Sequence, residues 1–401
     1  MAGGGELRNV VVVGGSYVGV NAAKELANLL PATHRVLLVE PHSHFHHLFA
    51  FPRFAIVPNY EHKAFVPYTG LFADAPGPNA TRHRIVRARA VSLQSNRLIL
   101  DREWQGSKEL PFDYLVAATG TRLASPGSMQ DDDKNASVAY LQAYQQDIKR
   151  AESVAVVGGG AVGVQMACDL KEFYPDKDVT LIHSRDQLMP VYHEGLSNLI
   201  KERFRELGVK LVTGSRAVVP PAGFPNDDNK PFEVRLQDGS SVKTEFAIIA
   251  TGQAPNNQFL AGLKPSEEDS LVNPKNGFIR VRPTLQFRDP KYGHLFAVGD
   301  IADSGAHKAA RPGAVQAAVA AKNIAALIEG REPSETISVV PPGIHLTLGL
   351  TKNVIFRNPN VAAGGTEPFV NLKDDGREDM GIDGVWERRG VKVASSQEYH
   401  L

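Results

Sequence analysis

Short apolar runs that end in glycine recur along the chain and predict buried strands. The first is the β-branched run VVVV at residues 10–13, a composition typical of a strand buried on both faces. From about Val18 onward, apolar residues recur at helical spacing, with Ala22, Ala23 and Leu26 on one side. The pattern therefore predicts a strand, a tight glycine turn and a helix.

Nearly the same stretch occurs twice. VVVVGGSYVGVNAAKEL begins at Val10, and VAVVGGGAVGVQMACDL begins at Val154. In such a turn the backbone N–H groups can approach a pyrophosphate, and the helix N-terminus adds roughly half a positive charge. The last glycine allows the helix to pack closely on the strand. The repeat predicts two dinucleotide cradles. Their residues are Gly14, Gly15, Ser16, Tyr17, Val18 and Gly19 in the first cradle, and Gly158, Gly159, Gly160, Ala161, Val162 and Gly163 in the second.

The two cradles differ at their middle position, where the first has Ser16 and the second has Gly160. Serine is small and can donate a hydrogen bond, so phosphate binding is still expected. A serine hydrolase elbow, G-x-S-x-G, is the competing interpretation. It requires glycine where this chain has Val18, which argues against a hydrolase.

The end of the second strand in each cradle predicts which nucleotide binds, because a ribose-binding acid lies about 20 residues beyond the third glycine. The strand RVLLVE ends in Glu40, whose carboxylate can accept hydrogen bonds from free ribose hydroxyls. The strand VTLIHSR ends in His183, Ser184 and Arg185, which suit a 2′-phosphate that a carboxylate would repel. The first cradle is expected to bind the ADP half of FAD. The second is expected to take NADPH, with NADH possible; an ordinary polar loop is the alternative explanation of Ser184 and Arg185.

Three further segments, YLVAATGT, FAIIATGQ and HLFAVGDIAD, combine an apolar strand with glycine. The A-T-G ends, which contain Thr119, Gly120 and Gly252, allow close backbone approach to a dinucleotide. In the third segment Gly299 and Asp300 follow the strand, and the Asp300 carboxylate can hold the ribityl hydroxyls of FAD.

The order of these segments predicts an α/β protein with two Rossmann-like dinucleotide-binding domains and a small C-terminal domain. DIKRAESVAVVGGG predicts a helix that leads into a strand, and FEVRLQDGSSVKTEF predicts a hairpin turning at Asp238-Gly239. PPAGFPNDDNKP predicts an exposed loop, and IHLTLGL and KNVIFRN are possible strands in the tail. The expected domains are residues 1–124 with 274–330 for FAD, 125–273 for NAD(P)H, and 331–401 for the C-terminal domain.

Composition excludes some classes of function. The 401 residues are 42% hydrophobic and 22% charged, as in ordinary globular proteins. Lys+Arg and Asp+Glu both number 44, so nothing indicates the basic face that a nucleic-acid partner needs. No apolar run approaches the roughly 18–20 residues that cross a bilayer, and the first residues lack the apolar core of a signal peptide. A cytoplasmic monomer or homodimer is expected, with peripheral membrane contact left open.

Several reactive side chains have a simple structural interpretation. Cys168 is the only cysteine, so no intramolecular disulfide is possible, and it is expected to be an inert core thiol. The acid run at residues 131–133 is expected to be a solvated loop. Four histidines crowd one loop after Glu40, where a metal site is conceivable but a wall of the flavin pocket is favoured, so no metal is expected. They are His42, His44, His46 and His47.

The chain resembles the two-dinucleotide-binding flavoproteins, the pyridine nucleotide:flavin oxidoreductases. Its marks are HFHHLFAFPR, LPFDYLVAATGT, YPDKDVTLIHS and AVGDIAD, and the resemblance runs from about residue 10 to residue 324. Within that superfamily the chain is most similar to the apoptosis-inducing-factor-like, ferroptosis-suppressor type of NAD(P)H:quinone oxidoreductase, and to fungal members of it.

The resemblance implies site residues beyond the two turns. Arg53 would pair with the FAD pyrophosphate, with a surface salt bridge as the alternative, and the backbone near Ala88 would contact FAD. A helix from about Pro312 through Ile328 would point its N-terminus at the flavin. Relatives carry Glu two residues after the third glycine of the second cradle. This chain has Gln165 there, a candidate catalytic residue that can hydrogen-bond but cannot act as a base.

These features predict an enzyme that passes hydride from NAD(P)H to FAD and then electrons to a second substrate. The resemblance implies a quinone acceptor. With one cysteine no dithiol relay is possible, so the electrons would pass directly from flavin to acceptor. A flavin oxidoreductase acting on a small metabolite, or a redox-sensing interaction protein resembling apoptosis-inducing factor, remains an alternative.

Overall fold

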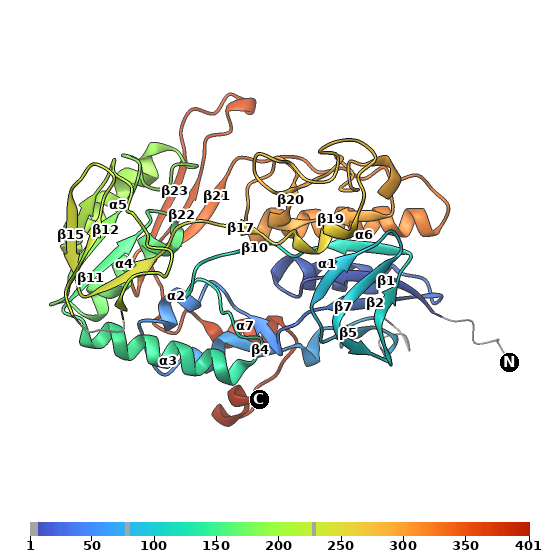
Figure 1. Cartoon of the computed structure of the whole chain (residues 1–401), viewed down its shortest axis with the longest axis horizontal. Helices are drawn as coiled ribbons and strands as arrows, with labels where there is room; N and C mark the ends of the chain where they lie inside the picture. Colours follow the sequence, from blue (N-terminus) through green and yellow to red (C-terminus); the bar gives the residue numbers. More distant parts are fainter. Residues whose placement is uncertain (1–6, 77–80, 227–229) are drawn as a thin grey trace.

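The computed structural model describes residues 7–76, 81–226 and 230–401. Figure 1 shows two α/β lobes side by side. The first lobe (mainly blue, cyan and orange) combines the N-terminal region with residues near 300, and the second (green to yellow) holds the residues between them.

The first lobe is built on a five-stranded parallel sheet with the order β19-β9-β1-β2-β5. Val10, Val11 and Val12 of the central strand are fully buried, which explains the unbroken apolar run. Strand β19 enters this sheet after the second lobe has been completed, so that lobe is an insertion. The strands are β1 (Arg8–Val13), β2 (His34–Val39), β5 (Arg84–Val86), β9 (Tyr114–Ala117) and β19 (Leu295–Ala297).

The second lobe repeats this arrangement with four parallel strands in the order β13-β12-β11-β16. The predicted hairpin is confirmed, since β14 and β15 pair across a turn that contains Asp238-Gly239. In both sheets the chain switches direction at the central strand, β1 or β11, and a glycine turn follows that strand. The strands are β11 (Ser153–Val157), β12 (Asp178–Ile182), β13 (Lys210–Val212), β14 (Phe232–Arg235), β15 (Ser241–Thr244) and β16 (Phe246–Ile249).

Helices α1 and α6 pack against each other on the face of the first sheet that carries Val10 and Val12. Helix α3 leads into β11 as predicted, and α6 begins at Ala310 rather than at Pro312. The helices are α1 (Tyr17–Leu29), α2 (Phe51–Phe54), α3 (Lys134–Arg150), α4 (Ala161–Phe173), α5 (Glu194–Leu207), α6 (Ala310–Ile328) and α7 (Ile382–Arg388).

Short strands complete the first lobe and connect the two lobes. The antiparallel meander β6–β7–β8 covers the sheet face that carries Val11 and Val13. Strand β10, which follows β9, pairs with β17, which follows β16, so this ladder joins the lobes. The strands are β3 (His44–His46), β4 (Phe65–Pro67), β6 (Ala90–Leu93), β7 (Arg97–Trp104), β8 (Ser107–Pro111), β10 (Thr121–Arg122), β17 (Ala254–Pro255), β18 (Ile279–Arg280) and β20 (Ala302–Asp303).

The C-terminal segment forms an antiparallel sheet of β21 (Gly343–Thr347), β22 (Lys352–Arg357) and β23 (Phe369–Asp374). The first two strands match the two expected from the sequence. The third was not expected, because its residues read as a polar stretch and its pairing with β22 decides its structure. The fully buried Trp386 of α7 donates a hydrogen bond of 2.8 Å to the carbonyl of Lys63, so this segment also packs on the first lobe.

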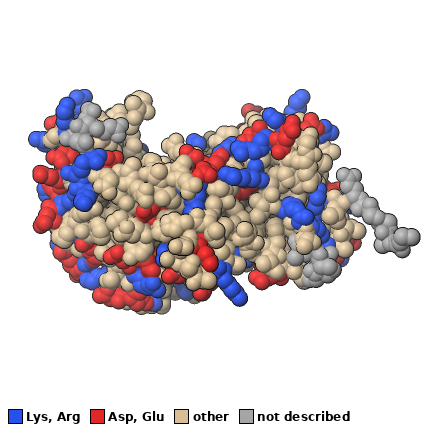
Figure 2. Space-filling view, turned by 90° about the horizontal axis from the view of Figure 1, so that it is seen from below, with Lys and Arg blue, Asp and Glu red and all other residues tan. Residues whose placement is uncertain are grey.

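The predicted α/β class with two Rossmann-like units is confirmed by these sheets, while the exact domain boundaries stay predictions. Residues 227–229 of the expected loop lie outside the described residues. Among the residues described, no helix is long and apolar enough to span a bilayer. Figure 2 shows Lys and Arg interspersed with Asp and Glu over one face, and the upper edge of the outline is indented between the two lobes.

Candidate functional site

The first glycine turn leaves no room for side chains at two positions. Gly14 has φ +102°, and a Cβ there would lie 2.6 Å from the carbonyl oxygen of Ala118. A Cβ on Gly19 would overlap the carbonyl oxygen of Gly14. Ser16 precedes α1 without a side-chain capping hydrogen bond, so no side chain competes for the first N–H groups of the helix. The turn therefore has the close approach and the free donors that bind a pyrophosphate.

The second turn has the same geometry. A Cβ on Gly158, which has φ +127°, would clash with the carbonyl of Ala250, and one on Gly163 would overlap the carbonyl oxygen of Gly158. Gly160 differs, because its φ is an ordinary −86° and an added Cβ would meet nothing within 4 Å. A side chain is therefore tolerated at this position, which explains why Ser16 can stand at the equivalent place in the first turn.

The strand-end residues Glu40 and His183 occupy equivalent positions. Glu40 is 4% exposed and accepts a hydrogen bond from the N–H of Gly15. The Nδ1 atom of His183 accepts one from the N–H of Gly159 at 3.0 Å. Burial lowers the pKa of His183, which keeps the ring neutral and able to accept this bond. The first cradle thus holds a carboxylate where the second holds a neutral ring.

Beside His183, the second cradle carries the two residues expected to bind a 2′-phosphate. Ser184 is partly exposed and Arg185 is exposed. Among the described residues, none forms a hydrogen bond or ion pair with the Arg185 side chain. Its guanidinium is therefore available to an anionic ligand.

Arg185→Glu is expected to raise the Michaelis constant for NADPH about 10- to 100-fold, the range of a lost charge-assisted hydrogen bond of about 1.5–3 kcal/mol. The constant for NADH is expected to change less than about threefold, since NADH has no 2′-phosphate. Steady-state assays with both nucleotides measure the two effects. Arg205→Glu, exposed in the last turn of α5, is the matched control. Equal shifts for the two nucleotides would show that Arg185 only contributes general charge.

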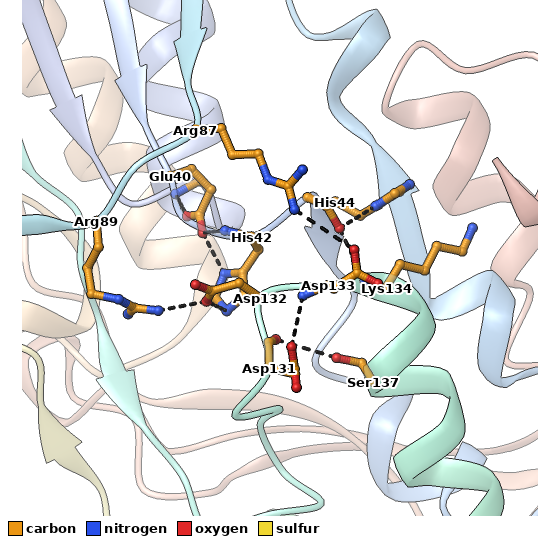
Figure 3. Close-up of polar contacts among 12 residues, drawn as sticks. Glu40, His42, His44, Arg87, Arg89, Asp131, Asp132, Asp133, Lys134 and Ser137 are labelled. Carbon is orange, nitrogen blue, oxygen red and sulfur yellow. Dashed lines mark hydrogen bonds and ion pairs between the residues drawn. The ribbon is translucent and has the colours of Figure 1, made fainter. Parts of the chain in front are cut away.

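A charged network surrounds Glu40 (Figure 3). The Nδ1 atom of His42 lies 2.5 Å from the Glu40 carboxylate, and the backbone N–H of His42 donates to the same oxygen at 2.9 Å. Asp132 pairs with Arg89 at 2.6 Å and lies 3.7 Å from the other ring nitrogen of His42. Burial alone would lower the pKa of His42, but the hydrogen bond with Glu40 and the negative charges of Glu40 and Asp132 together outweigh burial, and the pKa is raised. The acid run at residues 131–133 is therefore not simply a solvated loop, because Asp132 ties the start of α3 to the first cradle.

The remaining histidines of this loop form a largely neutral wall. His46 and His47 are buried, and burial lowers the pKa of His47 to about 3. The Tyr17 hydroxyl lies 2.8 Å from Nδ1 of His47. Within the described ranges, no three histidine, cysteine, aspartate or glutamate side chains are arranged to hold a metal ion. Contact of this wall with a flavin stays a prediction.

The two A-T-G segments lie beside each other where the lobes meet. The Thr119 hydroxyl donates to the carbonyl of Asn256 at 2.7 Å, and the Asn256 side chain donates to the carbonyl of Thr119 at 2.9 Å. An added Cβ on Gly120 or Gly252 would meet nothing within 4 Å, so side-chain crowding does not explain either glycine. The contacts bring the carboxyl ends of β9 and β16 together between the cradles.

Asp300 has an accessible but mostly buried carboxylate that forms no hydrogen bond within the part of the chain that is described. Burial raises its pKa, and the charge of Lys308 opposes the rise. The preceding Gly299 packs against Val18, which lies 3.0 Å from the position of a Cβ. Helix α6 begins at Ala310 without a side-chain cap. An unpartnered carboxylate and an uncapped helix end thus lie close to the first cradle.

Arg53 does not lie where the sequence resemblance implies. Its side chain is fully buried and forms a bidentate pair with Asp169 of α4, at 2.7 and 2.9 Å. Its remaining donors reach the carbonyls of Gly349 at 2.7 Å and Arg377 at 3.2 Å in the C-terminal segment. These partners occupy the guanidinium, so the expected pyrophosphate contact is wrong, and the alternative of a surface salt bridge is wrong as well. Arg53 instead forms a buried junction that links both lobes and the C-terminal segment.

Two other expected residues are buried beside the cradles. Gln165 is 8% exposed on α4, and its amide nitrogen has no hydrogen-bond partner among the residues described. Ala88 follows β5, is almost fully buried, and donates to the carbonyl of Val86 at 2.8 Å. The nucleotide contacts of both residues stay predictions.

Sequence reasoning missed a cavity of about 550 Å³. Four separate segments line it, and only the fold brings them together, so no local pattern could have revealed it. The imidazole of His307 lies in its wall and is 2.7 Å from the Tyr192 hydroxyl. The lining residues are Val191, Gln253, Gly305, Ala306, His307, Lys308, Val339, Val340 and Pro342.

Comparisons with known proteins agree with this geometry. Residues 8–322 match the family described as pyridine nucleotide-disulphide oxidoreductase. Fe-regulated protein 8 of Mycosarcoma maydis is 33% identical over 96% of both chains. Ferroptosis suppressor protein 1 of Mus musculus is 30% identical over 79% of this chain and 80% of that protein. The solved sulfide:quinone oxidoreductase from Aquifex aeolicus has a TM-score of 0.71 at 20% identity, covering 98% of this chain and 94% of that chain.

Proposed function

The chain belongs to the pyridine nucleotide-disulphide oxidoreductase family, and on that basis we propose that it passes electrons from NAD(P)H through bound FAD to a quinone. The coarser part of this statement, an FAD-dependent NAD(P)H oxidoreductase, is confirmed by the family and the relatives. The resemblance to apoptosis-inducing-factor-like proteins is confirmed as well, since one relative is named apoptosis-inducing factor homolog B.

The residues of the first cradle fit FAD. Gly14 and Gly19 leave the backbone open to a pyrophosphate, Glu40 stands at the ribose position, and Asp300 offers an unpartnered carboxylate for ribityl hydroxyls. The uncapped start of α6 can stabilise negative charge on a reduced ring. When bound, FAD supplies two-electron chemistry, taking a hydride from the nicotinamide and giving the electrons to an acceptor.

The second cradle and its neighbours fit NAD(P)H. The turn from Gly158 to Gly163 repeats the pyrophosphate geometry, and Arg185, which has no side-chain partner among the described residues, offers its cation to a 2′-phosphate. Gln165, on the helix that begins at this turn, has a buried amide beside Asp169, and its contact with a bound dinucleotide stays a prediction. Gln165 carries no ionisable group, so the role proposed for it is binding and orientation rather than acid–base chemistry.

The observation that carries the quinone proposal is the cavity lined by residues of both lobes and of the segment before β21. Its lining is mainly apolar, and its volume suits a substituted aromatic ring. Cys168 is fully buried and burial raises the pKa of its thiol, so it offers no thiolate to relay electrons. The similarity to the ferroptosis-suppressor type and to the sulfide:quinone oxidoreductase of Aquifex aeolicus supports the same acceptor class.

Anaerobic mixing of the FAD-loaded protein with NADPH is expected to bleach the visible flavin absorbance, and added menadione or a short-chain ubiquinone is expected to restore it. In steady state, quinone is expected to raise NADPH oxidation at least about tenfold over oxygen alone, because the apolar cavity favours the quinone. Bleaching without recovery by any quinone would leave the flavoenzyme assignment intact and overturn the acceptor. A spectrum that stays oxidised would overturn the hydride step itself.

A further inference from the structure

The cavity of about 550 Å³ lies where the two lobes meet the C-terminal segment. Val191 comes from the loop before α5, Gln253 follows the second A-T-G, and His307 lies between Asp300 and the start of α6. Val339 and Val340 close one side from the segment that leads into β21. The cavity therefore adjoins loops of both lobes and is largely apolar.

His307 is the imidazole among the residues that line this cavity. Its Nε2 atom is 2.7 Å from the Tyr192 hydroxyl, and the two rings meet edge to face with centroids 5.4 Å apart. No hydrogen bond to its Nδ1 atom is found in the described part of the chain. One ring nitrogen is thus fixed by a protein partner, and the other can meet a ligand in the cavity.

The surroundings of His307 favour the neutral form of its imidazole. Burial lowers its pKa, and within the described residues no carboxylate opposes that shift. Burial raises the pKa of Tyr192 to about 12, so that hydroxyl keeps its proton at neutral pH. The neighbouring Lys308 donates to the carbonyl of Ala302, and its ammonium lies 4.1 Å from the Phe278 ring centroid. Among the groups of this wall, His307 is therefore the one whose ordinary pKa lies closest to neutrality.

We propose that His307 is a catalytic residue that protonates the acceptor in this cavity, and that Tyr192 is a positioning residue that orients the imidazole. The proposal rests on the proposed quinone reductase function. The quinone takes two electrons and one proton as a hydride equivalent that originates in NAD(P)H. The second proton leaves Nδ1 of the charged imidazole as an O–H bond forms on the other quinone oxygen, and solvent then reprotonates the ring.

The pH dependence follows from this role. The charged imidazole is the acid, so the rate with quinone falls as pH rises through the pKa of His307, which lies below the usual value of about 6.5. Tyr192 accepts a hydrogen bond from Nε2–H of the charged ring. Removing the Tyr192 hydroxyl should therefore lower the pKa of His307 and move the break in the pH profile to lower pH. Tyr192 itself titrates too high to produce this break.

The test compares FAD-loaded wild type, His307→Gln, Tyr192→Phe and His294→Gln across pH. His294 precedes β19 at the end opposite Asp300 and serves as the matched control. His307→Gln is expected to lower kcat with menadione about 100-fold and to abolish the pH break, while anaerobic reduction by NADPH changes less than about threefold. Tyr192→Phe should shift the break downward with a smaller loss. Equilibrium dialysis of menadione against the oxidised enzyme, without NADPH, gives an independent readout. The Kd for menadione of His307→Gln should remain within about threefold of the wild-type value.

The outcomes separate this proposal from the function on which it rests. If wild type reduces quinone and His307→Gln keeps both its rate and its pH break, the role of His307 is overturned while the quinone reductase function stands. If wild type bleaches with NADPH but reduces no quinone, the proposed function fails first. Loss of menadione binding with an unchanged pH profile would make His307 a binding residue and would also overturn the proton-donor role.

Discussion

Replacing Arg53 with methionine is expected to lower the free energy of unfolding by about 3–5 kcal/mol, the usual result of removing one partner of a buried ion pair. Arg53 and Asp169 are both fully buried and pair through two hydrogen bonds of 2.7 and 2.9 Å. Without the guanidinium, the Asp169 carboxylate loses its counter-charge in a site where burial already raises its pKa. The carbonyl of Gly349 also loses a donor. Urea denaturation followed by far-UV circular dichroism measures the loss.

A double variant separates the charge effect from packing. Arg53→Met with Asp169→Leu is expected to recover much of the stability, because both charges are then removed from the interior. The control is Arg8→Met, which breaks the partly exposed pair of Arg8 with Asp113 and is expected to cost about 1 kcal/mol or less. A stable Arg53→Met protein that no longer retains FAD would contradict the buried junction and restore the pyrophosphate contact that the sequence resemblance implies.

The case of Arg53 marks the limit of what the sequence could predict. The cradles, the hairpin and the strands before the A-T-G ends depend on patterns a few residues long, and the structure has each of them. The partners of Arg53 are Asp169 on the inserted lobe and backbone carbonyls near residues 349 and 377, all distant in sequence. No local pattern encodes such a junction. Strand β23 and the His307 cavity were missed for the same reason.

The difference between Ser16 and Gly160 shows how far local steric reasoning reaches. Both residues precede their helices with extended backbone, at φ −81° and −86°, which any residue can adopt. The glycines at either end of each turn are different, because a side chain there would strike backbone atoms that cannot move independently. The sequence repeat therefore retains glycine at the ends of the turn and varies in the middle.

Gly19→Ala and Gly163→Ala are expected to disable the two cradles separately, with the largest functional effects in the molecule. The new methyl group would overlap the carbonyl oxygen of Gly14 in the first case and of Gly158 in the second. Each helix must then move away from its turn and lose the close backbone approach that a pyrophosphate requires. Gly19→Ala is expected to purify colourless even after incubation with excess FAD. Gly163→Ala is expected to stay yellow but to resist bleaching by NADPH, with apparent affinity reduced at least about 100-fold.

Gly160→Ala is the matched control, because its methyl group would meet nothing within 4 Å and its backbone is not in the left-handed region. It is expected to keep FAD and to bleach with NADPH within about twofold of wild type. Flavin absorbance measures the FAD that each of the three variants retains, and stopped-flow spectroscopy measures the rate at which NADPH reduces it. If Gly163→Ala lost its flavin while Gly19→Ala kept it, the two cradles would be assigned in the wrong order. If both retained FAD and bleached normally, a pyrophosphate would not depend on either close approach, and the glycine turns would serve only to pack helix on strand.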